Sequence, residues 1–86
     1  MKYLTKVVVM PKDGVADPQG LAVKNALHSM HYQSVDEVRV GKMINLTMTG
    51  ENLEEVKKSA QEFSDRLLVN PNIEKCVIEI TEGEMQ

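Results

Sequence analysis

The chain has 86 residues, of which 42% are hydrophobic and 27% charged, so we predict a single folded domain over residues 1–86 and exclude a disordered chain. The formal net charge of −3, with Lys and Arg scattered, excludes a general binder of nucleic acids or anionic membranes. No apolar run approaches a membrane span or a signal peptide, and the lone Cys76 cannot form an internal disulfide, so we expect a cytoplasmic protein.

The first elements read as a strand and a helix. Residues Tyr3–Met10 are apolar on both faces of a strand, which is typical of the interior of a sheet. After the Pro11–Gly14 turn, Asp17 is a helix cap and Pro18 the first helical residue. This helix is predicted to end near His31 and to bury a stripe of four residues: Val23, Ala26, Leu27 and Met30.

A hairpin is predicted next. Val35–Val40 and Met43–Thr49 have strand patterns, and Gly41-Lys42 between them suits a type II′ turn, in which the glycine needs a positive φ. Asn52 and Glu55 then resemble a capping box that starts a second helix.

The second helix is predicted to run to about Val69, where Asn70–Asn72 stops it, with Leu53, Val56, Ala60, Phe63 and Leu67 buried. A last strand follows over Cys76–Ile80. Residues 81–86 are expected to be a frayed acidic tail.

The order is therefore βαββαβ, which predicts an α+β, ferredoxin-like antiparallel sheet with both helices on one face. The first and third strands would be central. The second and fourth would be edges, and neither Val38–Val40 nor Val77–Ile80 carries a proline to block pairing with another chain. We therefore expect dimerisation through a sheet edge.

Two short segments are candidate contact sites. In the first, Asp17, Pro18, Gln19 and Gly20 either only start the helix or also contact a partner or an anion at its N-terminus. In the second, a small basic hairpin is either solvated or faces a partner; its residues are Arg39, Gly41 and Lys42.

No catalytic or metal-binding group is expected. His28 and His31 are three apart without further ligands in the pattern, so structural or surface roles are favoured over catalysis. Cys76 lies on an apolar strand face and is expected to be buried and inert. Too few aromatic residues are present for an RNA-binding sheet.

Four segments of the chain resemble the PurS family: Val15–Gly20, Ala26–Met30, Val38–Lys42 and Leu67–Glu74. They occur in the family's order, and the resemblance extends over essentially the whole chain. Ala16 stands where the family more often has Leu, and Val69 where Ala is usual.

The resemblance implies the small, non-catalytic subunit of phosphoribosylformylglycinamidine synthase, a glutamine-dependent, ATP-consuming ligase of purine biosynthesis. It also implies that the chain forms a homodimer or homotetramer and joins a large synthetase subunit to a glutaminase subunit, supporting ammonia transfer. ATP and Mg²⁺ would belong to the large subunit, with no cofactor on this chain. An ACT-like domain that binds small molecules shares the predicted topology and stays open as the alternative.

Overall fold

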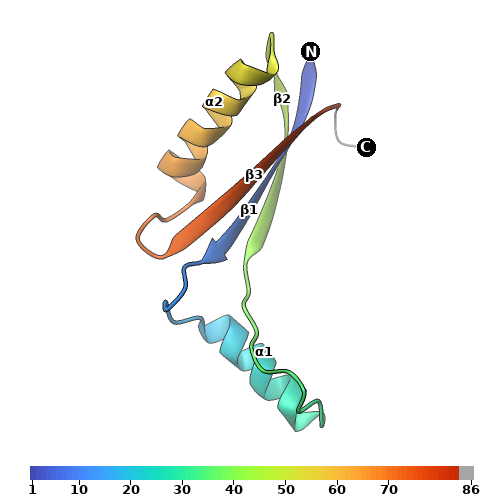
Figure 1. Ribbon diagram of the computed structural model, residues 1–86, viewed down its shortest axis with the longest axis vertical. Helices are drawn as coiled ribbons and strands as arrows, with labels where there is room; N and C mark the ends of the chain where they lie inside the picture. Colours follow the sequence, from blue (N-terminus) through green and yellow to red (C-terminus); the bar gives the residue numbers. More distant parts are fainter. Residues whose placement is uncertain (84–86) are drawn as a thin grey trace.

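The computed structural model of the chain describes residues 1–83, and its strands form one antiparallel sheet in the order β2-β1-β3 (Figure 1). The elements, in chain order, are β1 (Lys2–Pro11), α1 (Pro18–Ser29), β2 (Lys42–Thr49), α2 (Leu53–Phe63), η1 (Ser64–Leu68) and β3 (Glu74–Glu82). The predicted α+β class with an antiparallel sheet and two α-helices is confirmed.

β1 is the central strand of the sheet, as predicted. The side chains on one of its faces are almost fully buried: Tyr3, Thr5, Val7 and Val9. This face lies under α2, which packs mainly on β1 and β3. The opposite face of β1 is half-buried, which explains why both faces carry apolar residues.

α2 begins at the predicted cap. The Asn52 side chain accepts a hydrogen bond from the Glu55 N–H at 2.9 Å, and the Glu55 carboxylate accepts one from the Glu51 N–H at 3.2 Å. Val56 and Ala60 supply the buried face, with 2% and 0% of their surface exposed.

The second helix is predicted to continue to Val69, but in the structure its last turns are not α-helical. From Ser64 to Leu68 the helix widens into a π-turn, η1, closed by the Val69 N–H donating to the Ser64 carbonyl at 2.9 Å. The extra residue in the turn shifts the following side chains around the axis. Leu67, expected in the buried stripe, is consequently 80% exposed, and that prediction is wrong.

β3 is longer than predicted. It continues to Glu82, because Thr81 and Glu82 pair with Leu4 and Tyr3 of β1. The expectation of a frayed tail is therefore wrong for these two residues, while residues 84–86 lie outside the described part of the chain.

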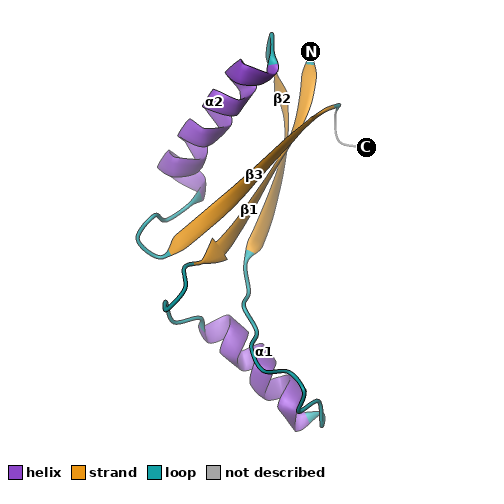
Figure 2. Cartoon of the chain, in the orientation of Figure 1, coloured by secondary structure: helices purple, strands orange, loops and turns teal. Residues whose placement is uncertain are grey.

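The predicted second strand over 35–40 is absent from the sheet. The segment runs beside α1 as an irregular connection before it reaches β2 (Figure 2). Gly41 does not have a positive φ, so the type II′ turn at Gly41-Lys42 is also wrong. The reason is that hydrogen bonds to α1, described below, hold the segment away from the edge of β2.

α1 does not cover the sheet beside α2, contrary to prediction. It lies beyond the end of the sheet (Figure 1), and Gly20 is its one buried residue. The stripe expected to face a core is open: Val23 and Met30 are 43% and 61% exposed, and Leu21 beside them is 58% exposed. We call residues 12–41, which contain α1 and the segment after it, the arm.

The arm makes the molecule elongated, with extents of 51 × 30 × 15 Å and a radius of gyration of 16.5 Å. A compact domain of 86 residues has a radius of gyration of about 12 Å. The accessible surface is 6301 Å², against about 5100 Å² for a typical 9.6 kDa monomer. Within residues 1–83, no helix has both the length and the apolar character needed to cross a bilayer.

Candidate interaction site

The two candidate segments meet at the base of the arm, through Asp17. One carboxylate oxygen of Asp17 caps α1 by accepting the Gly20 N–H at 3.0 Å, and the other accepts the Val40 N–H at 2.9 Å. These two bonds, the one from Val40 first, lower the pKa of Asp17, and the nearby charge of Arg39 adds to the effect while desolvation opposes it. Asp17 therefore joins the start of the helix to the end of the arm.

Gly20 allows this close approach. A Cβ at Gly20 would collide with the carbonyl oxygen of Val38 and with the Asp17 carboxylate. The group that approaches this glycine therefore belongs to the chain's own returning segment.

Arg39 fastens the arm to the sheet. Its Nη2 donates hydrogen bonds to the carbonyl oxygens of Pro11 at 2.9 Å and Lys12 at 2.7 Å, where β1 ends. Its Nη1 lies 3.5 Å from the Glu37 carboxylate and 3.9 Å from that of Asp13, both largely exposed. Arg39 therefore stabilises the chain's own fold. Neither interpretation of the basic hairpin, as solvated or as facing a partner, includes this role.

Gly41 and Lys42 have different surroundings in the structure. Gly41 lies against the end of β1, where a Cβ would collide with the Val9 carbonyl oxygen and the Met10 sulfur. Lys42 begins β2 opposite Val9 and is exposed. Four of the seven candidate residues are exposed: Pro18, Gln19, Gly41 and Lys42. Gly41 has no side chain, so the other three are the ones with an exposed side chain.

The two histidines close α1 at its C-terminus. The Nε2 of His28 lies 2.8 Å from the Val35 carbonyl oxygen, to which it can only donate. His31 has a φ of 74°, and the Tyr32 N–H donates to the Leu27 carbonyl at 3.0 Å, the bond that defines a Schellman cap. Both histidines therefore have structural roles.

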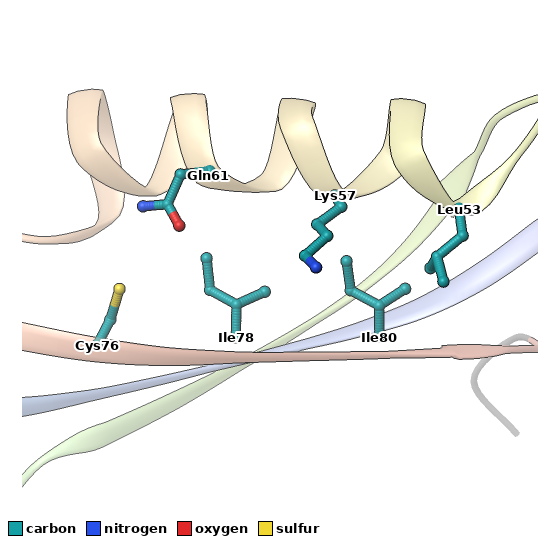
Figure 3. A pocket seen from close by; sticks show the side chains of 6 residues that line it. All are labelled: Leu53, Lys57, Gln61, Cys76, Ile78 and Ile80. Atoms are coloured by element: carbon teal, nitrogen blue, oxygen red, sulfur yellow. The ribbon is translucent and has the colours of Figure 1, made fainter.

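A groove of about 370 Å³ lies between α2 and β3, and the sequence did not indicate it (Figure 3). Its wall on α2 is formed by Leu53, Lys57 and Gln61, which point toward Cys76, Ile78 and Ile80 on β3. Lys57 and Gln61 read as solvent-facing residues of an amphipathic helix, so the pattern gave no sign of a wall.

Cys76 is half-buried in this groove rather than fully buried, which corrects the prediction. The groove lining pairs this thiol with no histidine or carboxylate. Over residues 1–83, no cluster of three or more His, Cys, Asp or Glu side chains could hold a metal ion.

A family model described as "PurS: Phosphoribosylformylglycinamidine (FGAM) synthase" matches residues 4–82. The PurS subunit of that synthase from Bacillus subtilis is 41% identical over 80 residues, which cover 93% of this chain and 94% of the relative. The corresponding subunit from Methanocaldococcus jannaschii is 37% identical, with 95% of this chain and 99% of the relative covered.

Solved structures that contain PurS subunits are also similar to this chain. The C2 crystal form of B. subtilis PurS superposes with a TM-score of 0.81 at 41% identity, over 93% of this chain and 99% of that one. A chain in the structure of PurLQS from Thermotoga maritima gives a TM-score of 0.86 at 26% identity, over 94% of this chain and 99% of that one.

Proposed function

Because this chain belongs to the PurS family of phosphoribosylformylglycinamidine synthase subunits, we propose that it is the non-catalytic subunit that joins the synthetase and glutaminase subunits and supports ammonia transfer between them. ATP and Mg²⁺ are bound by the large subunit in this proposal, and the present chain binds neither. The synthase is a glutamine-dependent ligase of purine biosynthesis.

The similarity to a chain of the T. maritima PurLQS assembly is the observation that carries the proposal. It extends over nearly the whole chain, arm included, so the arm conformation is compatible with a subunit inside an assembly. The polar groups that the sequence singles out support it as well. Asp17 accepts hydrogen bonds from backbone groups of the arm, and Arg39 donates to backbone carbonyls of the arm and of the end of β1, so both side chains stabilise the chain's own fold, as a scaffold requires.

Pro18 and Gln19 are our candidates for the contact with a partner subunit. Both are exposed on the first turn of α1, at a helix start that Asp17 holds rigidly against the returning segment. A preorganised surface loses little conformational entropy on binding.

Reconstitution tests the function. We expect amidine formation from glutamine, with the large and glutaminase subunits present, to depend on this chain. Amidine formation from added ammonia should depend on it much less, because free ammonia bypasses the transfer step. Equal glutamine-dependent rates with and without the chain would overturn the assignment.

Co-elution tests the contact surface. Gln19→Trp should reduce recovery of the three-subunit complex, whereas Asn25→Trp, at another exposed position of α1, should not. If both variants co-elute as the unmodified chain does, the first turn of α1 is not the contact.

The ACT-like alternative has no support from the similar proteins, since those reported above are synthase subunits. An amino acid ligand would raise the melting temperature of the isolated chain by mass action, and we expect no such rise. We also propose a cytoplasmic location, because a half-buried free thiol such as Cys76 stays reduced there. Recovery of the chain outside the cytoplasmic fraction would contradict this.

A further inference from the structure

The backbone groups of β3 alternate in a phase that two hydrogen bonds fix. The Lys12 N–H donates to the Ile73 carbonyl at 2.8 Å, where β3 is about to begin. The Gly83 N–H donates to the Lys2 carbonyl at 3.0 Å, just beyond its end. In an antiparallel ladder every second residue bonds to the neighbouring strand. Odd-numbered residues of β3 therefore bond to β1, and even-numbered residues direct their N–H and C=O groups away from the sheet.

The outer edge of β3 is open over three of these even-numbered residues: Cys76, Ile78 and Ile80. β3 is the last strand of the sheet, and their backbone N–H and C=O groups have no hydrogen-bond partner among residues 1–83. The N–H of Glu74 differs, because it donates to the Asn70 carbonyl at 2.7 Å in the preceding turn. Such a row of unpaired donors and acceptors is a template for a further strand.

The groove between α2 and β3 lies beside this open edge. The same three residues of β3 pair with the buried face of β1, so their side chains point toward α2 and form the floor of the groove (Figure 3). The groove volume of about 370 Å³ is within the range of ligand sites, roughly 300–1000 Å³. One stretch of β3 therefore offers both unpaired backbone groups and a lined groove.

We propose that this edge and groove bind an extended segment of a partner subunit, which joins the sheet as a strand alongside β3. The unpaired groups recur at every second residue, about 6.8 Å apart, and only an extended backbone has the same repeat. Main-chain hydrogen bonds hold the segment, and its alternate side chains enter the groove. The inference rests on the proposed function, because the segment belongs to a subunit that this chain joins.

Lys57 determines the chemistry of that segment. Its ammonium points into the groove (Figure 3), and it forms no ion pair in the described part of the chain. Gln61 beside it already donates to Asp65, at 3.0 Å. Leu53 and the isoleucines of β3 make the remaining lining largely apolar. The segment therefore has apolar residues at alternate positions and an aspartate or glutamate that faces Lys57.

A second copy of β3 does not have this chemistry. Antiparallel pairing of two outer edges about an axis at Ile78 would place Glu74 opposite the second copy's Glu82, at both ends of the ladder. Like charges directly opposite each other destabilise a sheet. The second copy would also bring a thiol and an isoleucine toward Lys57 rather than a carboxylate.

Hydrogen exchange in the reconstituted three-subunit complex, trapped and then read by NMR on the released chain, tests the edge. The amides of Cys76, Ile78 and Ile80 gain a partner, so we expect them to exchange at least about tenfold more slowly in the complex than in the isolated chain. The amides of Val77 and Glu79 bond to β1 in both states and are the internal control.

Each result of this experiment has a distinct meaning. A complex that forms with unchanged exchange at the three even-numbered amides overturns this inference alone. If no complex forms, the proposed function fails and the inference fails with it. Slow exchange at these amides already in the isolated chain would show that a second copy covers the edge, which also overturns the inference.

Backbone chemistry tests the hydrogen bonds themselves. Because Cys76 is the one cysteine, the chain can be assembled by ligating a 1–75 thioester to a synthetic 76–86 peptide. An N-methyl group on Ile78 removes one outward donor and keeps the side chain and the ladder to β1. We expect the dissociation constant of the complex to rise at least about tenfold relative to the all-amide ligated chain. Equal constants, with equal melting temperatures of the two isolated chains, would overturn the proposal.

Charge reversal tests the predicted carboxylate. Lys57→Glu should raise the dissociation constant of the complex at least about tenfold. Lys58→Glu, at the next exposed position of α2 and outside the groove lining, should change it by less than about threefold. Equal effects of the two variants would refute an acidic residue opposite Lys57.

Discussion

Replacing Arg39 with alanine should loosen the arm from the sheet and lower the free energy of unfolding. The guanidinium donates two hydrogen bonds, to the carbonyls of Pro11 and Lys12, and its side chain is 25% exposed. A bond from a charged donor contributes about 1.5–3 kcal/mol when buried, so partial exposure reduces each to about 1 kcal/mol.

The expected loss is therefore about 2 kcal/mol. The ion pairs of Arg39 with Asp13 and Glu37 add little, because both carboxylates are largely exposed. With an unfolding entropy near 2.1 cal/mol/K per residue, a chain of this length should melt roughly 11 °C lower. Arg39→Lys should recover about half, since a single ammonium cannot reproduce the fork geometry.

Thermal and urea unfolding at a fixed protein concentration measure this loss, and hydrogen exchange at the Val40 amide reports the arm separately. Lys75→Ala is the matched control, because Lys75 approaches the same Asp13 carboxylate at 3.5 Å but is 56% exposed. If Arg39→Ala and Lys75→Ala melt within about 2 °C of each other, the two carbonyl bonds do not hold the arm.

Three further outcomes are expected. Ser64→Ala should raise the free energy of unfolding in urea by about 1 kcal/mol, because it removes a fully buried hydroxyl without a partner among the described residues, while exposed Ser59→Ala should change it by less than about 0.5 kcal/mol. His31→Gly should add about 1 kcal/mol by relieving a positive φ, and His31→Ala should not. The pKa of Asp17 is lowered, first by the hydrogen bond from the Val40 N–H. The ionised carboxylate therefore stabilises the fold fully above the ordinary carboxyl pKa of about 3.9, and this stabilisation is lost as pH falls through the lower pKa of the folded state. Asp17→Asn should abolish this acid-dependent step in an NMR titration of the Val40 amide.

The elements that the structure confirms are those that local sequence patterns predict. The alternating apolar residues of β1, the Asn52 cap of α2 and the Asp17 cap of α1 each depend on neighbours a few positions away. Such patterns can be read directly from a sequence, because the residues that satisfy them lie within one turn or one strand.

The errors arise where one residue type serves two physical purposes. Gly41 reads as a turn residue because glycine readily adopts a positive φ, yet here it is needed because Val9 and Met10 come close. Likewise Val38 and Val40 have the right residue type for a strand, but residue type does not say whether the segment pairs with the sheet.

Of the two hydrogen bonds that Asp17 accepts in the candidate site, one could be predicted from the sequence and the other could not. The bond from Gly20 to Asp17 spans three residues and follows from capping rules, whereas the bond from Val40 spans 23 and depends on how the arm folds back. The widening of α2 at Ser64 has no sequence signal that we can identify.

The strand order β2-β1-β3 also determines when the chain can fold during synthesis. β1 is made first but gains its second neighbour only when Glu74–Glu82 has left the ribosome. Until then Val7 and Val9 lie in a two-stranded ladder, which is marginal in water. Pairing across so much sequence is slow, and a chain truncated before β3 would leave this apolar strand exposed to aggregation. Only a chain that includes β3 therefore has a stable sheet, so a product terminated before β3 should not compete for a place in the assembly.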